Sequence, residues 1–311
     1  MIVVVCLNPA LDVTHHVGAV DWGGVNRPRA VQARAGGKGL NVARTLHALG
    51  VDVLVLGLAG GVTGDGVEAA LRELGVPAVF IPVAGETRRT FTVVDGRGGT
   101  TAFHEPGPTI GAAEFADFRV QYQKATADAE AVVLSGSLPP GLTAGIYATL
   151  IQAAGAPAVL DTHGEALRRG AAAGAAIVKP NLAELAALAG PTASTALATR
   201  GGPGLAAVAA GELRGARAVV VTLGPDGLLA ATEDGCWRAR PPAAVAGNAT
   251  GAGDAVAAAL AHGLVLGRPW DERLRHAAAL GAAAAAAPVA GEFRRQDYLG
   301  ALSAVTVEEV R

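Results

Sequence analysis

Hydrophobic residues along the chain fall into short, nearly continuous runs, and each run is followed by a polar or glycine-bearing turn. The runs cover residues 2–7, 53–58, 131–134, 158–160, 176–178 and 218–222. Such runs are typical of parallel strands buried on both faces, because neither face then needs polar side chains. Since stretches of helical character separate the runs, the sequence predicts a doubly wound α/β sheet.

Three other stretches alternate apolar and polar residues, namely 11–17, 31–35 and 90–103, and the last turns near Asp95-Gly96. Alternation indicates strands with one polar face, and the third stretch is typical of a hairpin. The sequence therefore predicts a small sheet outside the main one. We expect this sheet to act as a lid over a cleft. An edge extension and a dimer surface are the alternatives, and a lid can also serve as a dimer surface.

Length and composition restrict the class of protein. The chain has 311 residues, of which 51% are hydrophobic, so a single large α/β domain with a substantial core is expected. Its net charge is −2 and it has no basic run, which argues against a nucleic-acid partner. Cys6 and Cys236 lack metal-ligand spacing and fit a reducing, cytoplasmic environment.

Neither a signal peptide nor a membrane span is expected. The first residues lack the basic region of a signal peptide. The uncharged stretch 131–160 is interrupted by Ser135-Gly136-Ser137 and by Pro139-Pro140, which does not fit a membrane helix.

Polar residues follow the predicted buried strands at the point where each strand ends. They are Asn8 and Asp12, Ser135-Gly136-Ser137, Asp161, Lys179-Pro180-Asn181 and Thr222-Leu223-Gly224. Because the carboxyl ends of parallel strands meet at one edge, and ligands bind at that edge in open α/β sheets, these residues predict one polar site.

Two glycine turns open onto predicted helices. Gly36-Gly37-Lys38-Gly39 precedes a helix over residues 40–49, and Gly251-Ala252-Gly253 precedes Asp254 and an alanine-rich helix. Glycine lets the backbone approach a ligand closely, and a helix start binds anions through its free N–H groups. Two such turns suggest two anionic groups. The alternatives are a tight turn with a solvated Lys38, and a first-turn acid favoured by the helix dipole at Asp254.

Two further motifs each have a competing interpretation. Asn181 followed by Glu184 fits a variant of the capping box, although the carboxylate could also face a hydrated Mg²⁺ ion. Gly64, Gly66 and Glu86 mimic a dinucleotide-binding fingerprint, but those glycines do not directly follow a strand. A nicotinamide enzyme is therefore not expected.

Together, the motifs resemble those of the ribokinase-like (PfkB) carbohydrate kinases over nearly the whole chain. Segments 36–44 and 248–254 are similar to the two signatures of that family, and 134–141, 178–184 and 221–227 lie between them in the expected order. Segments 8–12, 86–88 and 105–108 resemble its phosphosugar branch. The resemblance implies one three-layer α/β/α domain over 1–311, with a β lid in segments of about 10–35 and 87–106. It also implies ATP and Mg²⁺ as cofactors and often a dimer through the lids.

The resemblance also implies a role for each matching residue. Asp254 would be the general base, and the N–H groups of Gly251, Ala252, Gly253 and Asp254 would form an anion hole. Asp12, Gly37, Asn41 and Ser137 would contact the sugar, and Lys38 and Arg88 would hold the phosphate already on it. Lys179, Asn181, Glu184, Thr222, Gly224 and Gly227 would bind the nucleotide, with Glu184 meeting the metal through water.

The substrate implied by the resemblance is a ketohexose phosphate. Fructose 1-phosphate, which would give fructose 1,6-bisphosphate, is the first expectation, because Ala102 stands where 6-phosphofructokinase relatives have an arginine for the substrate phosphate. Tagatose 6-phosphate and fructose 6-phosphate are alternatives. A kinase of an unphosphorylated sugar or nucleoside, and a non-catalytic sugar or nucleotide sensor on the same fold, also stay open.

Overall fold

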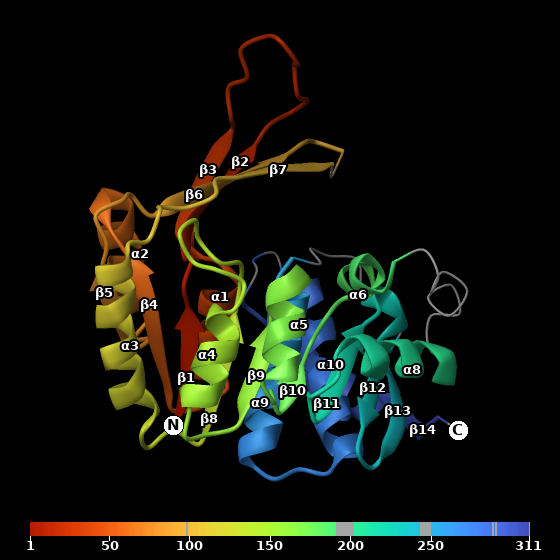
Figure 1. Cartoon of the computed structure of the whole chain (residues 1–311). Coiled ribbons are helices and arrows are strands. Elements are labelled where there is room, and N and C mark those ends of the chain that lie inside the picture. The colour runs from red at the N-terminus through yellow and green to blue at the C-terminus, as the bar shows by residue number, and fades with distance from the viewer. Residues whose placement is uncertain (98, 191–201, 243–249, 288, 290, 311) are drawn as a thin grey trace.

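The computed structural model describes residues 1–97, 99–190, 202–242, 250–287, 289 and 291–310. These residues form a three-layer α/β/α body with a smaller, separate sheet projecting from one edge of it (Figure 1). The predicted fold class is confirmed. No helix in the described part of the chain is long and apolar enough to cross a bilayer.

The main sheet contains ten strands among the described residues. In spatial order they are β14 (Thr306–Glu309), β13 (Gly235–Arg240), β12 (Leu228–Thr232), β11 (Ala218–Thr222), β10 (Ile177–Val178), β9 (Ala158–Asp161), β8 (Ala131–Ser135), β1 (Ile2–Cys6), β4 (Val53–Ala59) and β5 (Ala78–Pro82). Neighbours from β11 to β5 pair in parallel, whereas β12, β13 and β14 add an antiparallel edge.

Every predicted buried run overlaps a parallel strand, and the run 218–222 coincides with β11. The prediction missed β5 and the antiparallel edge. β13 reads Gly-Cys-Trp-Arg-Ala-Arg and carries two charges, so it lacks a continuous apolar run. β5 ends in Pro82 at the edge of the sheet, where the missing N–H of proline is tolerated.

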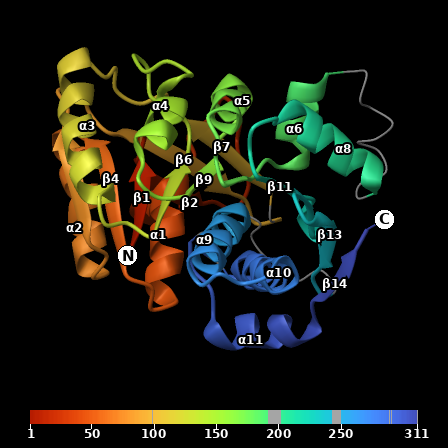
Figure 2. The same ribbon diagram turned by 60° about the horizontal axis from the view of Figure 1, so that its bottom comes forward.

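Helices cover both faces of the main sheet (Figures 1 and 2). The face packed against Val4 carries α1 (Lys38–Ala48), α2 (Gly61–Glu73), α9 (Ala252–Val265) and α10 (Trp270–Ala286), with α11 (Arg295–Ala304) lying on α10. The face packed against Val3 carries α3 (Ala112–Thr126), α4 (Ile146–Ala153), α5 (Gly164–Ala172), α6 (Leu182–Ala189) and α8 (Pro203–Glu212). Alternate side chains of the central strand β1 therefore enter two separate cores.

The smaller sheet, here called the outer sheet, has the order β3 (Ala30–Gly36), β2 (Ala10–His16), β6 (Arg88–Val94) and β7 (Thr100–His104). The alternating stretches and the hairpin are thus confirmed as strands. Paired residues share a face of a sheet. Asp12, Thr90 and His104 pair across β2, β6 and β7 and lie on a polar face, whereas Val13, Phe91 and Phe103 lie on the opposite, apolar face.

The fingerprint-like glycines form no ligand loop. Gly64 and Gly66 lie inside helix α2, and the Glu86 carboxylate accepts a hydrogen bond from the Thr63 amide at 2.6 Å. A carboxylate at a helix start is stabilised by the free amides and by the dipole. Glu86 therefore caps α2.

The point at which the main sheet changes its direction of winding lies at β1. The chain passes from β1 to β4 on one side, and β8 pairs with β1 on the other side. A crevice forms at the carboxyl ends of strands beside such a switch point, and ligands bind there in open α/β sheets. Asn8 and Ser137 lie at these two strand ends.

Candidate active site

The second glycine turn places Asp254 in the first turn of helix α9. Gly251, the N-cap residue, has a φ of 86°, a left-handed conformation that glycine adopts without strain. The Ala255 amide donates to the Gly251 carbonyl at 3.0 Å, so the amides of residues 252–254 precede this intrahelical bond. Asp254 is only 6% exposed. Residues 248 and 249 of this signature lie outside the described residues.

The first glycine turn meets the second one at Asn41. Gly37 is the N-cap of α1 with a φ of 96°, and Asn41 lies in the first turn of that helix. Its side-chain amide donates to Asp254 Oδ2 at 2.9 Å, within the core. Two turns that are more than 200 residues apart in sequence therefore converge on one carboxylate.

Two ammonium groups share one buried carboxylate close to Asp254. Lys38 Nζ lies 3.1 Å from Asp161 Oδ1, and Lys179 Nζ lies 3.3 Å from the same oxygen. Asp161 is completely buried. A β-carbon built on Gly253 would lie 3.5 Å from Lys179 Nζ, so this cation sits beside the first turn of α9. The cations and the free amides together suit a phosphoryl group.

The environment of Asp254 raises its pKa to about 7. Burial is the main cause, and the negative charge of Asp161 adds to it, whereas the hydrogen bond from Asn41 and the charges of Lys38 and Lys179 act in the opposite direction. A carboxyl group with a pKa near the working pH can accept a proton from a hydroxyl and release it again.

Glu184 caps helix α6 and also faces Lys38. Asn181 Oδ1 accepts from the Glu184 amide and Glu184 Oε2 accepts from the Asn181 amide, both at 2.8 Å, which confirms the capping box at the start of α6. The other carboxylate oxygen, Oε1, lies 3.5 Å from Lys38 Nζ. The cap thus holds Glu184 against the charged cluster.

The carboxylate oxygens of Asp161 and Glu184 fit a hydrated magnesium ion. Asp161 Oδ2 is buried without a hydrogen-bond partner, and Glu184 supplies a second hard oxygen ligand beside Lys38. Within the described residues, no group of three His, Cys, Asp or Glu could hold a metal. Mg²⁺ typically keeps several waters and is bound by one or two carboxylates plus substrate phosphates, so this sparse set is sufficient.

The polar face of the outer sheet presents Asp12 and Arg88. Thr90 Oγ1 donates to Asp12 Oδ1 at 2.6 Å, and a β-carbon on Gly36 would lie 1.9 Å from Asp12 Oδ2, so a larger residue at position 36 would displace the Asp12 carboxylate. Arg88 donates to the carbonyls of Asn8 at 3.2 Å and Glu105 at 3.4 Å. These acceptors are uncharged, so the positive charge of Arg88 is not neutralised by them.

Asn8 ties the outer sheet to the switch point of the main sheet. Its side-chain amide donates to Ser137 Oγ at 3.2 Å, beyond β8, and to the Pro106 carbonyl at 3.0 Å, beyond β7. Its own carbonyl receives the hydrogen bond from Arg88. The predicted sugar-side residues Ser137 and Arg88 are therefore held by one buried asparagine.

The remaining predicted nucleotide residues lie at the carboxyl end of β11. Thr222 forms a parallel bridge with Asn181, and Gly224 and Gly227 begin and follow the short 3₁₀ turn Gly224–Asp226. A β-carbon on Gly227 would lie 2.0 Å from the Ala239 carbonyl, so packing against β13 already requires this glycine. Its predicted contact with a nucleotide stays a prediction.

Asp161 and Asn8 were placed on the polar edge by the sequence, but neither was assigned a role. Both directly follow a buried strand, which is the signal that could have selected them. Their importance comes from neighbours that are distant in sequence: Lys38 and Lys179 for Asp161, and Arg88 and Ser137 for Asn8.

Comparison with known proteins agrees with this geometry. The family model described as "pfkB family carbohydrate kinase" matches residues 5–294. The ATP-dependent 6-phosphofructokinase isozyme 2 of Mycobacterium tuberculosis is 37% identical over 303 residues, which cover 95% of this chain and 87% of that protein. The tagatose-6-phosphate kinase of Staphylococcus epidermidis is 30% identical over 286 residues, covering 90% of this chain and 91% of that enzyme.

A solved structure shows the same architecture. The crystal structure of a possible 1-phosphofructokinase from Thermotoga maritima superposes with a TM-score of 0.86 at 25% sequence identity, and it covers all of this chain and 99% of that chain. The similarity therefore extends over the α/β/α body and the outer sheet together.

Proposed function

Because the chain belongs to the pfkB family of carbohydrate kinases, we propose that it phosphorylates fructose 1-phosphate with ATP to give fructose 1,6-bisphosphate. The chain is a sugar-phosphate kinase, a phosphotransferase with an alcohol group as acceptor, and its family implies ATP as the phosphoryl donor. The identity of the ketohexose phosphate and the roles of the residues are the proposal.

The hydrogen bond between Asn41 and Asp254 carries the proposal, because it brings the buried base to the sugar side of the cleft. Asp254 accepts the proton of the acceptor hydroxyl while that oxygen bonds to the γ-phosphorus and the bond to the leaving ADP breaks. The amides of Ala252 and Gly253 stabilise the charge on the phosphoryl oxygens. Phosphoryl transfer depends mainly on such positioning and charge stabilisation.

The sugar phosphate lies between the outer sheet and Asp254. The Asp12 carboxylate accepts hydrogen bonds from its hydroxyls, and the Asn41 amide donates to them. Ser137 lies beside these two residues. Arg88, whose acceptors in the structure are carbonyl groups, and Lys38 neutralise its phosphate. Two cations suit a dianion, and arginine can bind it through two hydrogen bonds.

The nucleotide lies along the carboxyl ends of β10 and β11. Lys179 contacts its phosphates, and Thr222, Gly224 and Gly227 line its path. A magnesium ion held through water by Glu184, with Asp161 nearby, would neutralise charge on the phosphates. The unpartnered Asp161 Oδ2 supports this assignment.

Fructose 6-phosphate and tagatose 6-phosphate are the alternative substrates. They are supported by the names of the two relatives, a 6-phosphofructokinase and a tagatose-6-phosphate kinase. Fructose 1-phosphate is favoured because Ala102, which pairs with Thr92 of β6, provides no cation for a 6-phosphate.

Initial rates with ATP and each of fructose 1-phosphate, fructose 6-phosphate, tagatose 6-phosphate and unphosphorylated fructose test the assignment. We expect the highest kcat/KM with fructose 1-phosphate. A higher kcat/KM with a 6-phosphate would refute the chosen substrate. Ligand-dependent thermal stabilisation without ADP release would instead indicate a sensor.

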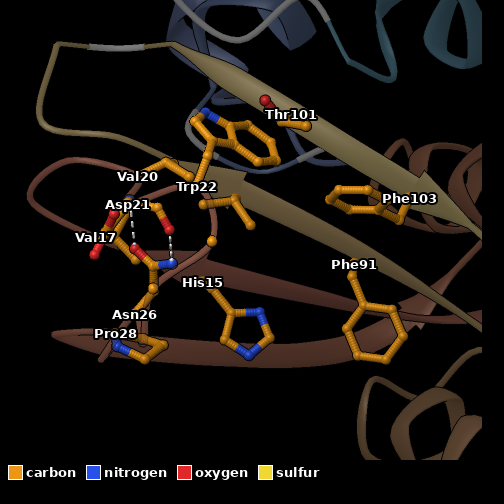
Figure 3. A pocket seen from close by; sticks show the side chains of 13 residues that line it. His15, Val17, Val20, Asp21, Trp22, Asn26, Pro28, Phe91, Thr101 and Phe103 are labelled. Carbon is orange, nitrogen blue, oxygen red and sulfur yellow. Dashed lines mark hydrogen bonds between the residues drawn. The ribbon is translucent and has the colours of Figure 1, made fainter.

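We also propose that two copies of the chain associate through the apolar faces of their outer sheets. Trp22 is 73% exposed and Phe103 is 54% exposed, and with Phe91 and His15 they line an open cavity of about 520 Å³ on this face (Figure 3). Exposed apolar surface of this kind is typical of a protein–protein interface. The opposite, polar face stays directed at the active site.

A further inference from the structure

The segment after α10 lies directly on the turn of α1 that holds the catalytic carboxylate. Gly291 has a φ of 74°, and a β-carbon built on it would lie 2.8 Å from Asn41 Oδ1 and 3.0 Å from Asn41 Cα. Asn41 is the residue that donates to Asp254. The backbone at position 291 therefore limits where the Asn41 side chain can lie.

The next residue joins the same two segments by an ion pair. Glu292 Oε1 lies 2.7 Å from Arg44 Nη2, and Arg44 follows Asn41 by three residues on α1, so both project from one face of that helix. Arg44 is only 7% exposed. The Glu292 carboxylate offsets part of the cost of burying the Arg44 charge, so this pair favours one position of the segment.

We infer that Glu292 is a positioning residue for Asp254: its ion pair with Arg44 holds Gly291 against Asn41, and this contact keeps the Asn41 amide on the carboxylate. The inference rests on the proposed role of Asp254 as the base. Glu292 itself contacts neither the substrate nor the reacting atoms. Its effect reaches Asp254 through Gly291 and the first turn of α1.

The direction of the pKa change separates this role from a simple charge effect. Removing the negative charge of Glu292 would by itself lower the pKa of a neighbouring carboxyl group. Loss of the Asn41 hydrogen bond raises the pKa of Asp254, because that bond stabilises the charged form. The charges of Asp161, Lys38 and Lys179 also act on Asp254, and those of Arg34 and Asp12 also act on Arg44. The substitution keeps all five of these charges.

The experiment compares wild type, Glu292→Gln and the control Asp297→Asn. Asp297 pairs with Arg294 on the surface nearby, so its substitution removes the same charge without touching α1. The Asp254 carboxyl is titrated by ¹³C NMR of aspartate-labelled protein and assigned with Asp254→Asn. We expect Glu292→Gln to raise the midpoint by roughly half a pH unit or more and to lower kcat roughly tenfold, and Asp297→Asn to change neither.

A second variant reaches Asn41 from the other side of the contact. Gly291→Ala places a methyl group against Asn41 Oδ1, at a φ that alanine rarely adopts, and should raise the same midpoint without removing any charge. If Glu292→Gln does not fold, the titration of Gly291→Ala tests the inference instead. An unchanged or lower midpoint in either folded variant would overturn the inference.

The NMR titration needs no substrate, so it separates this inference from the proposed function. A wild-type protein inactive with every phosphosugar would refute the proposed reaction. The titration would still decide whether Glu292 positions Asp254.

Discussion

A carboxylate in the first turn of a helix can be a catalytic base or simply a favourable partner of the helix dipole. Asp254→Asn should lower kcat by roughly 10²–10⁴-fold, because the side chain can no longer accept a proton. The affinity for ATP should stay within about twofold of wild type. Asp271 lies in the first turn of α10 and provides the matched control. Asp271→Asn should leave kcat unchanged. Near-normal turnover in Asp254→Asn would remove this residue from the base role.

The pKa of Asp254 predicts how activity depends on pH. Because the folded protein raises this pKa to about 7, the carboxyl is increasingly protonated below that pH and cannot accept a proton. The acid limb of kcat/KM, which reports ionisation in the free enzyme, should therefore have its midpoint near pH 7. A rate that stays constant from pH 8 down to pH 5 would contradict the assignment.

The same pKa predicts a stability change. A carboxyl whose folded pKa is raised above its unfolded value of 3.8 binds more protons in the folded state, so it destabilises the fold as pH rises from about 4 to 7. Asp254→Asn should raise Tm by about 2–6 °C at pH 8 and hardly at all at pH 4. Calorimetry at both pH values measures this difference. An equal shift at the two pH values would indicate an origin other than the buried charge.

Neighbouring residues of one strand serve different faces of the outer sheet. Arg88 of β6 contacts the carbonyls of Asn8 and Glu105 beside the site, whereas Arg89 pairs with Glu105 and lies over Phe91 on the apolar face. Arg88→Ala should raise KM for the phosphosugar roughly 10–100-fold and change KM for ATP little, because one charge-assisted phosphate contact is lost. Arg89→Ala is the control and should leave both constants near those of wild type.

Steady-state kinetics with each substrate varied in turn would measure these effects. Free fructose, where it is turned over at all, should not distinguish Arg88→Ala from wild type, since it has no phosphate. Equal effects of the two substitutions would place the phosphate elsewhere.

How well each element could be predicted depended on its surroundings. The parallel strands β1, β4 and β8 are buried on both faces, so their continuous apolar runs identified them. The antiparallel strands β13 and β14 lie at the edge and mix apolar with polar residues, which gives a weaker periodic signal. Local pattern therefore predicted the centre of the sheet and missed its edge.

In the proposed dimer, the apolar faces of the two outer sheets meet. Phe103 lies on its apolar face, so Phe103→Asp should convert a dimer into a monomer by placing a charge in the interface. Val62 is even more exposed than Phe103 but lies on α2, and Val62→Asp is the control that should keep the dimer. Light scattering after gel filtration would measure both masses. A wild-type protein that is monomeric at micromolar concentration would refute association through this face.

The active site could be predicted in part, because its loops have local signals. Glycine turns before helices, and polar residues after buried strands, are determined by short stretches of sequence, and they placed Asn41, Asp254, Lys179 and Glu184 at one edge of a sheet. Local sequence does not show which residue pairs with each charged side chain. Lys38 was expected to hold a sugar phosphate, and the structure adds its contacts with Asp161 and Glu184.

The α/β class, the parallel strands, the alternating strands of the outer sheet and the glycine turns all follow from residues close together in the chain, because periodicity and turn chemistry are local properties. The pKa of Asp254, the sharing of Asp161 by two lysines and the hold of Glu292 on α1 depend on groups that only folding brings within a few ångströms. Burial and electrostatic interaction act through space rather than along the chain. The tertiary structure alone therefore decides how these charges act on one another.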